Sequence, residues 1–322
     1  MTNNIWKNGI WGVIIGDALG EPVQFMDREE LAAQKPVTCM ESGRVYKSIP
    51  AGTWTDDSSL TLALLDSINT CKTIDLTDIM ERFCKWLYHG EYTPEGEAFD
   101  MGYTTELSIE RYAGGQDVHT CGGTDERSNG NGSLMRIMPA CLYAYEKQHS
   151  AGMSDEEAIS AIHDVSALTH AHLRSKIACG LYYFIVRAIL DEEGGLMTRV
   201  KKGVDDGFAF YRRDISNLTE LARYGRIEDT DTFADLTADD IRSTGYVVDS
   251  LEAAVWSLIT TPDFAECELR AVNLAGDSDT IAAIAGGLAG LYYGYDSIPA
   301  GWIDVIRRKE YIRELISQTT DI

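Results

Sequence analysis

The chain has 322 residues, of which 44% are hydrophobic and 25% are charged, and this composition excludes a disordered, collagen-like or disulfide-scaffold protein. The 51 acidic residues outnumber the 28 basic residues and give a formal net charge of −23. Such a charge repels phosphate backbones and argues against nucleic-acid binding. A phosphorylated ligand would therefore need metal ions or backbone N–H groups to supply the positive field.

The cysteines and the apolar segments indicate the cellular compartment of the protein. Seven cysteines are scattered without a CxxC pair, which indicates free thiols in a reducing compartment and argues against a zinc ribbon. The first apolar segment is interrupted by Asp17 and is unlike a secretory signal. The longest small-apolar stretch, residues 281–293, is too short to cross a bilayer and is typical of a buried helix. We therefore expect a cytoplasmic protein without a membrane partner.

Apolar residues recur at helical spacing through most of the chain. The pattern predicts helices over residues 5–19, 58–68, 76–87, 154–162, 177–190, 247–259, 264–274 and 281–293. Ser154 is followed three residues later by Glu157, which is the capping-box pattern of a helix start. No segment shows the sustained period-two alternation of a half-buried strand. The predicted fold class is all-α.

Glycine-rich polar segments separate the predicted helices. They cover residues 41–57, 90–105, 113–133 and 191–207. The last segment has the composition of a linker, but helices of similar composition flank it and no Pro/Ser-rich hinge is present. We therefore interpret residues 1–322 as a single domain with long functional loops.

Two acidic clusters stand where predicted helices begin. The first comprises Thr55, Asp56 and Asp57, and the second comprises Asp277, Asp279 and Thr280. Such residues commonly cap helix N-termini, which is the ordinary explanation for one cluster. Two clusters that each offer Asp, Asp and Thr oxygens also form a ligand set that suits Mg²⁺, Mn²⁺ or Ca²⁺ and not zinc or copper. The spacing does not reveal whether the two clusters meet in space.

A third polar segment, residues 120–136, is rich in glycine. Closely spaced glycines let the backbone approach a ligand, and successive N–H groups can form an anion-binding nest. An ordinary turn is the alternative explanation. The segment lacks the GxxxxGK[ST] pattern of a P-loop, and no predicted strand precedes it as a dinucleotide-binding fingerprint requires.

Six motifs, taken in order, resemble those of the ADP-ribosylglycohydrolase family, which includes the dinitrogenase reductase-activating glycohydrolases and the ADP-ribosyl-arginine and ADP-ribosyl-serine hydrolases. The motifs are Gly16-Asp17-Ala18-Leu19-Gly20, Thr55-Asp56-Asp57, residues 99–105, residues 128–136, Leu168-Thr169-His170 and Gly276-Asp277-Ser278-Asp279-Thr280. Each motif alone is weakly specific. Six in the family's order, over residues 12–294, form a specific signal.

The resemblance implies a compact, orthogonal all-α bundle with two Mg²⁺ ions, or Mn²⁺ in some members, at the bottom of an ADP-ribose cleft. It implies a metal shell with one half from Thr55, Asp56 and Asp57 and the other half from Asp277, Asp279 and Thr280. The segment that binds the diphosphate and the ribose corresponds to Ser128, Asn129, Gly130, Asn131, Gly132 and Ser133. His170 matches a histidine on the ribose side, and Asp100 matches an active-site aspartate of the nitrogenase-regulating branch.

One departure from the family pattern concerns the catalytic base. Gln24 stands where many members have a glutamate that is a proposed base in the serine-directed branch, and a neutral amide cannot take a proton. We therefore predict Asp100 as the general acid or base, with Glu21 as the reserve candidate. A loop aspartate that hydrogen-bonds its own backbone is the ordinary alternative for Asp100. His170 and His172 do not share a helix face and do not indicate a metal site, so His172 is expected to be structural or exposed.

Taken with the resemblance, these features predict metal-dependent hydrolysis of the glycosidic bond between ADP-ribose and a modified protein side chain. Phe99, Asp100 and residues 130–136 are closest to the nitrogenase-regulating branch and favour arginine as the attached residue. Serine-linked ADP-ribose and the small ester O-acetyl-ADP-ribose are alternative substrates. A catalytically weak ADP-ribose-binding protein is the alternative of another class; Gln24 favours it, and the intact set of six metal-type ligands disfavours it.

Overall fold

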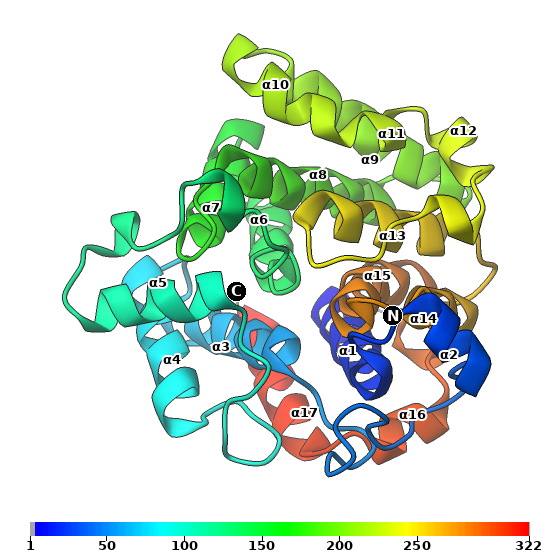
Figure 1. The fold of residues 1–322 in the computed structure, drawn as a ribbon. Helices are drawn as coiled ribbons and strands as arrows, with labels where there is room; N and C mark the ends of the chain where they lie inside the picture. The colour runs from blue at the N-terminus through cyan, green and yellow to red at the C-terminus, as the bar shows by residue number, and fades with distance from the viewer. Residues whose placement is uncertain (1–3, 322) are drawn as a thin grey trace.

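Helices and loops make up residues 4–321, the part of the chain that the computed structural model describes (Figure 1). The helices of the first half are α1 Ile5–Gly20, α2 Arg28–Gln34, α3 Asp56–Cys71, α4 Leu76–His89, α5 Tyr103–Ala113, α6 Met138–Ala151, α7 Asp155–Ala167 and α8 Leu173–Asp191. Those of the second half are α9 Leu196–Tyr211, α10 Leu218–Leu221, α11 Gly225–Glu228, α12 Thr230–Ala234, α13 Val247–Ile259, α14 Phe264–Asn273, α15 Ser278–Tyr293, α16 Ala300–Val305 and α17 Lys309–Ser317. Within the described residues no β-sheet forms, and the predicted all-α class is confirmed.

The eight helices predicted from periodicity all form, most of them with extra residues at their ends. α3 begins at Asp56 and α15 at Ser278, so that most of each acidic cluster lies inside a first helical turn. The capping box of α7 is present: the Ser154 hydroxyl accepts from the Glu157 N–H at 3.2 Å, and the Glu157 carboxylate accepts from the Ser154 N–H at 2.8 Å. Local sequence signals therefore located these elements well.

The interpretation of residues 191–207 as a polar loop is wrong. Only a short connection after α8 is irregular, and α9 begins at Leu196 and packs along α8. Val200, Val204 and Phe208 recur every four residues and are buried against the core. The lysines, aspartates and glycines that stand between them make the segment polar as a whole and hide this narrow apolar stripe.

The central feature of the fold is the contact between α1 and α15, which lie side by side in the middle of Figure 1. Three glycines of α1 make this contact possible. A Cβ atom on Gly12 would lie 2.0 Å from the Gly286 carbonyl oxygen, and one on Gly16 would lie 2.1 Å from the Ala282 carbonyl oxygen. The backbones of the two helices therefore touch. At Gly20 the contact brings the end of α1 against Asp279, at the start of α15.

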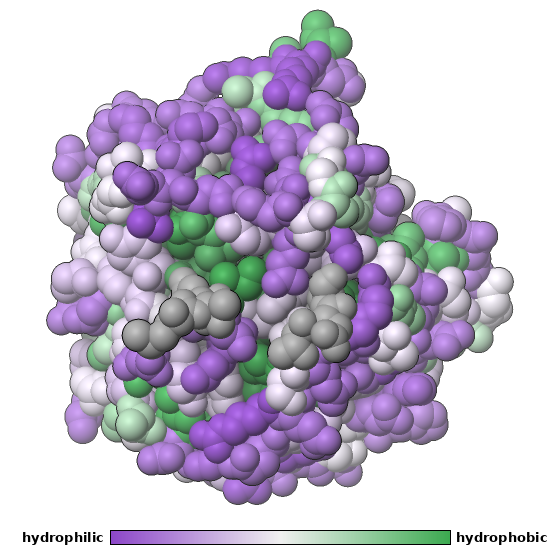
Figure 2. Space-filling view, turned by 180° about the vertical axis from the view of Figure 1, so that it is seen from behind, coloured by the Kyte–Doolittle hydropathy of each residue, from purple (hydrophilic) through white to green (hydrophobic). Residues whose placement is uncertain are grey.

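Apolar side chains form one core cluster that reaches from Trp6 of α1 to Ile316 of α17. The face shown in Figure 2 is hydrophilic over most of its area, with hydrophobic residues in smaller patches between the hydrophilic ones. No helix within residues 4–321 has the length and apolar character needed to cross a membrane. The fold is therefore held by burial of apolar surface around the α1–α15 pair.

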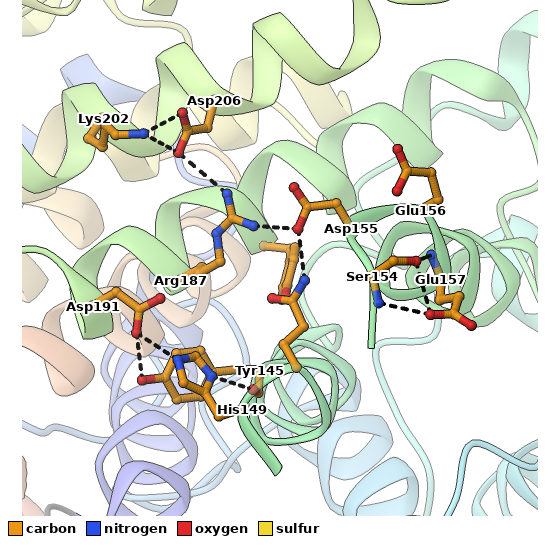
Figure 3. A network of polar contacts seen from close by, with 12 residues as sticks. Tyr145, His149, Ser154, Asp155, Glu156, Glu157, Arg187, Asp191, Lys202 and Asp206 are labelled. Carbon is orange, nitrogen blue, oxygen red and sulfur yellow. Dashed lines mark hydrogen bonds and ion pairs between the residues drawn. The ribbon is translucent and has the colours of Figure 1, made fainter. Parts of the chain in front are cut away.

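A polar network on the surface joins four neighbouring helices (Figure 3). Arg187 of α8 donates to Asp155 of α7 at 2.6 Å and to Asp206 of α9 at 3.4 Å. Tyr145 of α6 donates to Asp191 at the end of α8 at 2.9 Å. Partly exposed contacts of this kind contribute only about 0–1 kcal/mol each. The network therefore orients the helices, whereas the core supplies most of the stability.

Replacing Gly16 with alanine should lower the free energy of unfolding by about 1–3 kcal/mol, because the new methyl group would overlap the Ala282 carbonyl and push α1 from α15. Urea unfolding measures the change. Gly195→Ala is the matched control, since Gly195 is exposed, has a φ of −75° and offers open space to a Cβ atom. Equal midpoints for Gly16→Ala and the unchanged protein would contradict the close approach.

Candidate active site

A carboxylate from α1 holds the start of α3. Asp17 is fully buried and accepts from the N–H groups of Thr55 at 3.0 Å and Ser58 at 2.9 Å. It also accepts from the hydroxyls of the same two residues, at 3.0 Å and 2.5 Å. These bonds satisfy donors that a helix N-terminus leaves free. Asp56 and Asp57 are therefore not needed as caps of α3.

Sequence reasoning gave Asp17 no function of its own. The available signal was a single aspartate in residues 9–20, which are otherwise apolar, because a buried carboxylate needs hydrogen-bond donors. Those donors come from α3, and no local pattern in α1 identifies them.

The two acidic helix starts meet in the structure. The Thr280 hydroxyl of α15 donates to Oδ2 of Asp57 in α3 at 3.3 Å, although 223 positions separate the two residues in the chain. Asp277 occupies the N-cap position of α15 but caps no N–H group. Its Oδ2 instead accepts from the Asn131 amide at 2.5 Å. Helix capping therefore does not account for Asp277.

A cavity of about 340 Å³ opens beside this junction. The predicted site residues that line it are Asp56, Asp100, Gly130, Asn131, Gly132, His170, Asp277 and Thr280. The predicted residues Glu21, Thr55, Asp57 and Asp279 are buried and do not line the cavity. A cavity of this volume lies within the range of small-ligand sites.

The 128–133 loop meets the cavity with its middle and not with its ends. The Ser133 hydroxyl accepts from Ser166 in the protein interior, and the Asn129 side-chain oxygen accepts from Ser175. The expectation that the N–H groups of this whole loop face a diphosphate is wrong for Ser128 and Asn131 because those groups donate to Asp125 and Gly245 carbonyls. Within residues 4–321 no protein acceptor is found for the N–H groups of Gly130 and Gly132, which line the cavity.

A buried arginine supports this loop from behind. Arg136 donates to the Gly132 carbonyl and, at 3.0 Å, to the Thr169 hydroxyl, which lies 2.8 Å from Nδ1 of His170. Burial lowers the pKa of His170 to about 3, so the ring is neutral at pH 7. A Cβ atom on Gly132 would lie 2.8 Å from this ring, which explains the glycine. His172 has a different place: it accepts from the Arg174 N–H as the N-cap of α8.

Phe25, Tyr103 and Arg127, which are not among the predicted site residues, also line the cavity. Tyr103 is 76% exposed and Phe25 is 60% exposed, which leaves both aromatic faces accessible to a ligand. Arg127 is a basic residue in the lining of the cavity. The expectation that metal ions and backbone N–H groups alone supply a positive field is therefore incomplete.

Residues 6–321 match the family model described as ADP-ribosylglycohydrolase. The chain belongs to the ADP-ribosylglycohydrolase family. It is 30% identical to the ADP-ribosylarginine hydrolase Tri1 of Serratia proteamaculans over 313 residues, 97% of this chain and 78% of that protein. It is also 30% identical to the ADP-ribosyl-[dinitrogen reductase] glycohydrolase of Rhodospirillum rubrum over 298 residues, 92% and 88% of the two chains.

A solved structure of an ADP-ribosylglycohydrolase-related protein complex superposes on the chain with a TM-score of 0.76 and 28% identity, covering 99% of this chain and 98% of that one. The resemblance drawn from the six motifs is thereby confirmed, and the chain is an ADP-ribosyl glycohydrolase enzyme.

The candidate site gathers seven carboxyl groups in or behind the cavity. They are Asp17, Glu21, Asp56, Asp57, Asp100, Asp277 and Asp279. Burial raises the pKa of each group above its ordinary value, and repulsion by neighbouring carboxylates adds to the rise for Asp56, Asp57 and Asp279. Burial raises the pKa of Asp17 to about 6, that of Asp100 to about 7 and that of Glu21 to about 8.

Asp100 stands apart from the other carboxyl groups by its backbone and its position. Its φ is 61°, in the left-handed region that aspartate tolerates better than most residues. Contacts with Gln24 and Asp279 favour the ionised carboxylate and partly offset the effect of burial on its pKa. Gln24 is fully buried, and neither of its amide atoms has a hydrogen-bond partner of normal geometry within the described residues.

The donor set fits a hard cation in its chemistry. Oδ1 of Asp57, Oδ1 of Asp279 and Oε1 of Glu21 are buried without a hydrogen-bond partner in the described chain, which is costly for carboxyl oxygens. Carboxylate and hydroxyl oxygens without thiolate or imidazole suit Mg²⁺ or Mn²⁺. Among residues 4–321 no three His, Cys, Asp or Glu side chains converge as metal ligands do. The fit therefore rests on the donor type and on the three unsatisfied oxygens.

Without divalent cations, the free energy of unfolding should fall as the pH rises from about 4 to about 8. The unfolded chain loses these protons near pH 4, whereas folded Asp17, Asp100 and Glu21 hold them until about pH 6, 7 and 8. The folded state thus binds more protons than the unfolded state in this pH range. Raising the pH therefore destabilises the folded state relative to the unfolded state.

Thermal unfolding between pH 5 and pH 8 in a chelator measures this effect. Glu21→Gln should flatten the fall, because it removes one of the protons that the folded state retains. Glu193→Gln is the control, since Glu193 is exposed in the connection after α8. If Glu21→Gln and Glu193→Gln give parallel curves, the buried carboxyl group does not hold its proton as described.

Proposed function

We propose that the enzyme hydrolyses the bond between ADP-ribose and an arginine side chain of a modified protein, using a pair of hard divalent cations, Mg²⁺ or Mn²⁺. The residues that would hold the cations are Thr55, Asp56, Asp57, Asp277, Asp279 and Thr280. The observation that carries the proposal is the meeting of α3 and α15, with unsatisfied buried carboxyl oxygens, beside the cavity that the Gly130–Gly132 segment lines.

The chain's own residues bind the diphosphate and the ribose of the ADP-ribosyl group. Arg127 and the N–H groups of Gly130 and Gly132 are the positively polarised groups of the cavity and suit the diphosphate. Neutral His170 lies against Gly132 and lines the same wall, where it can hydrogen-bond a ribose hydroxyl. Bound cations would supply Lewis-acid stabilisation of ribose oxygens and of a water molecule.

Asp100 is the better candidate for proton transfer. It lines the cavity, and a pKa raised to about 7 lets it both take and give a proton near neutral pH. Glu21 is 1% exposed and does not line the cavity, so we infer a supporting role for it behind Asp100. In the overall reaction, water gives its hydroxyl to the anomeric carbon, the carbon–nitrogen bond breaks, and the guanidine nitrogen receives the proton.

Arginine is favoured over serine by the relatives. The two relatives described above carry the names of an arginine-directed hydrolase and a dinitrogen reductase glycohydrolase. The family match over residues 6–321 supports treating residues 1–322 as one domain. Seven free thiols support a reducing, cytoplasmic setting.

Incubation with a protein that carries ADP-ribosyl-arginine, in the presence of Mg²⁺, should release free ADP-ribose. Chromatography of the released nucleotide measures the reaction, with serine-linked protein and O-acetyl-ADP-ribose as parallel substrates. Release from either alternative substrate but not from arginine would transfer the assignment to that substrate. Tight ADP-ribose binding in a calorimeter without turnover of any substrate would identify a binding protein instead.

Asp56→Ala and Asp279→Ala should each reduce turnover by at least about 100-fold, because each removes an oxygen ligand from the proposed cation pair. Both variants should also lose the rise in melting temperature that Mg²⁺ gives the unchanged protein. Asp205→Ala is the control, since Asp205 is exposed on α9. Full turnover in Asp56→Ala or Asp279→Ala would show that the cations are held elsewhere.

A further inference from the structure

A second cavity, of about 510 Å³, shares Asp100 with the candidate active site. Two loops form it: residues 46–53, which precede α3, and residues 95–100, which follow α4. Both loops lie in the lower part of Figure 1. We call this second cavity the acceptor groove. Asp100 lines both cavities and therefore stands between them.

Apolar and acidic groups together line the acceptor groove. Tyr46 and Phe99 supply aromatic surface, and Tyr46 is 42% exposed. Glu95, Glu97 and Asp100 supply carboxylates, and the lining contains no lysine, arginine or histidine. The groove is therefore a negative surface with aromatic walls, a combination that attracts organic cations.

The two glutamates differ in their partners. Glu95 forms an ion pair with Arg307 at 2.7 Å, which neutralises its charge at the edge of the groove. Glu97 is exposed and forms no ion pair with any residue between 4 and 321. The only basic residue of the 46–53 loop, Lys47, is exposed and is not part of the lining. Glu97 is thus the carboxylate of the rim that is open to a positively charged partner.

We propose that the acceptor groove binds the modified arginine and its neighbouring residues in the protein substrate, and that it selects substrates with basic residues beside the modified arginine. The inference rests on the proposed function, since it requires the ADP-ribosyl group to lie in the first cavity. The scissile bond then lies at Asp100, and the leaving arginine has to occupy the other side of that residue.

Charge complementarity identifies the occupant. The guanidinium group of arginine is a planar cation that stacks on aromatic rings and pairs with carboxylates. A serine hydroxyl or a neutral acetyl ester gains no charge attraction from the carboxylates of the groove, and the released acetate ion is repelled by them. Lysine or arginine beside the modified residue would meet Glu97, whose exposed position makes its attraction dependent on salt.

Kinetics on paired substrates test the proposal. The substrates are free ADP-ribosyl-arginine and a peptide in which the ADP-ribosylated arginine is flanked by lysines, each assayed at low ionic strength with Mg²⁺. The measured quantity is the ratio of kcat/KM for the peptide to kcat/KM for free ADP-ribosyl-arginine. Glu97→Lys should lower this ratio about tenfold, and Glu97→Gln about threefold, because reversal of a charge costs more than its removal.

Glu193→Lys is the matched control, because it makes the same change of charge at an exposed site between α8 and α9 and should leave the ratio unchanged. If Glu97→Lys leaves the ratio unchanged, the assignment of the acceptor groove is wrong, but the proposed function stays intact. A change of oligomeric state with an unaltered ratio would show that the groove binds a second copy of the chain, and would also overturn the proposal. If the unchanged protein releases no ADP-ribose from either arginine substrate, the proposed function fails and the groove assignment fails with it.

Discussion

The backbones of α1 and α15 approach so closely at Gly12, Gly16 and Gly20 that no side chain fits between them. This contact places the end of α1 beside the start of α15, and Asp17 then fixes the start of α3 at the same point. Three helix ends from distant parts of the chain thus share one position. The carboxyl groups of the site follow from this packing, because each is carried there by a rigid helix or by a loop tied to one.

Such packing has an electrostatic consequence. Removing carboxyl groups from water and bringing them together raises their pKa values, and several of their oxygens remain without donors. The clustered carboxylates therefore require positive charge to balance them. Protons supply it at low pH, and our proposal assigns this role to divalent cations at neutral pH. Arg127 and the free N–H groups of the glycine loop meet the same need on the ligand side.

Asp100 lies between this cluster of carboxyl groups and the acceptor groove. It belongs to a loop between α4 and α5 whose residues adopt left-handed conformations at several points, among them Gly90, Tyr92 and Gly96. Because of that irregular backbone, the end of the loop, at Asp100 and Gly102, lines the first cavity, and residues 95–100 line the acceptor groove. A single loop can therefore both select the leaving group and transfer a proton at the scissile bond, while the helical scaffold remains fixed.

Much of this protein follows from local sequence. The spacing of apolar residues placed eight helices, the Ser154–Glu157 pair located a capping box, and the order of six motifs identified the family, because each signal is contained within a few turns of chain. The sequence also singled out the acidic residues whose oxygens are suited to hard cations. Tertiary structure alone decided that Thr280 reaches Asp57, that Asp17 caps α3, and that Asp100 divides two cavities. Those facts depend on how separate segments of the chain pack against one another, with 41 positions between Asp17 and Ser58 and 223 between Asp57 and Thr280, and no spacing along the chain encodes such a contact.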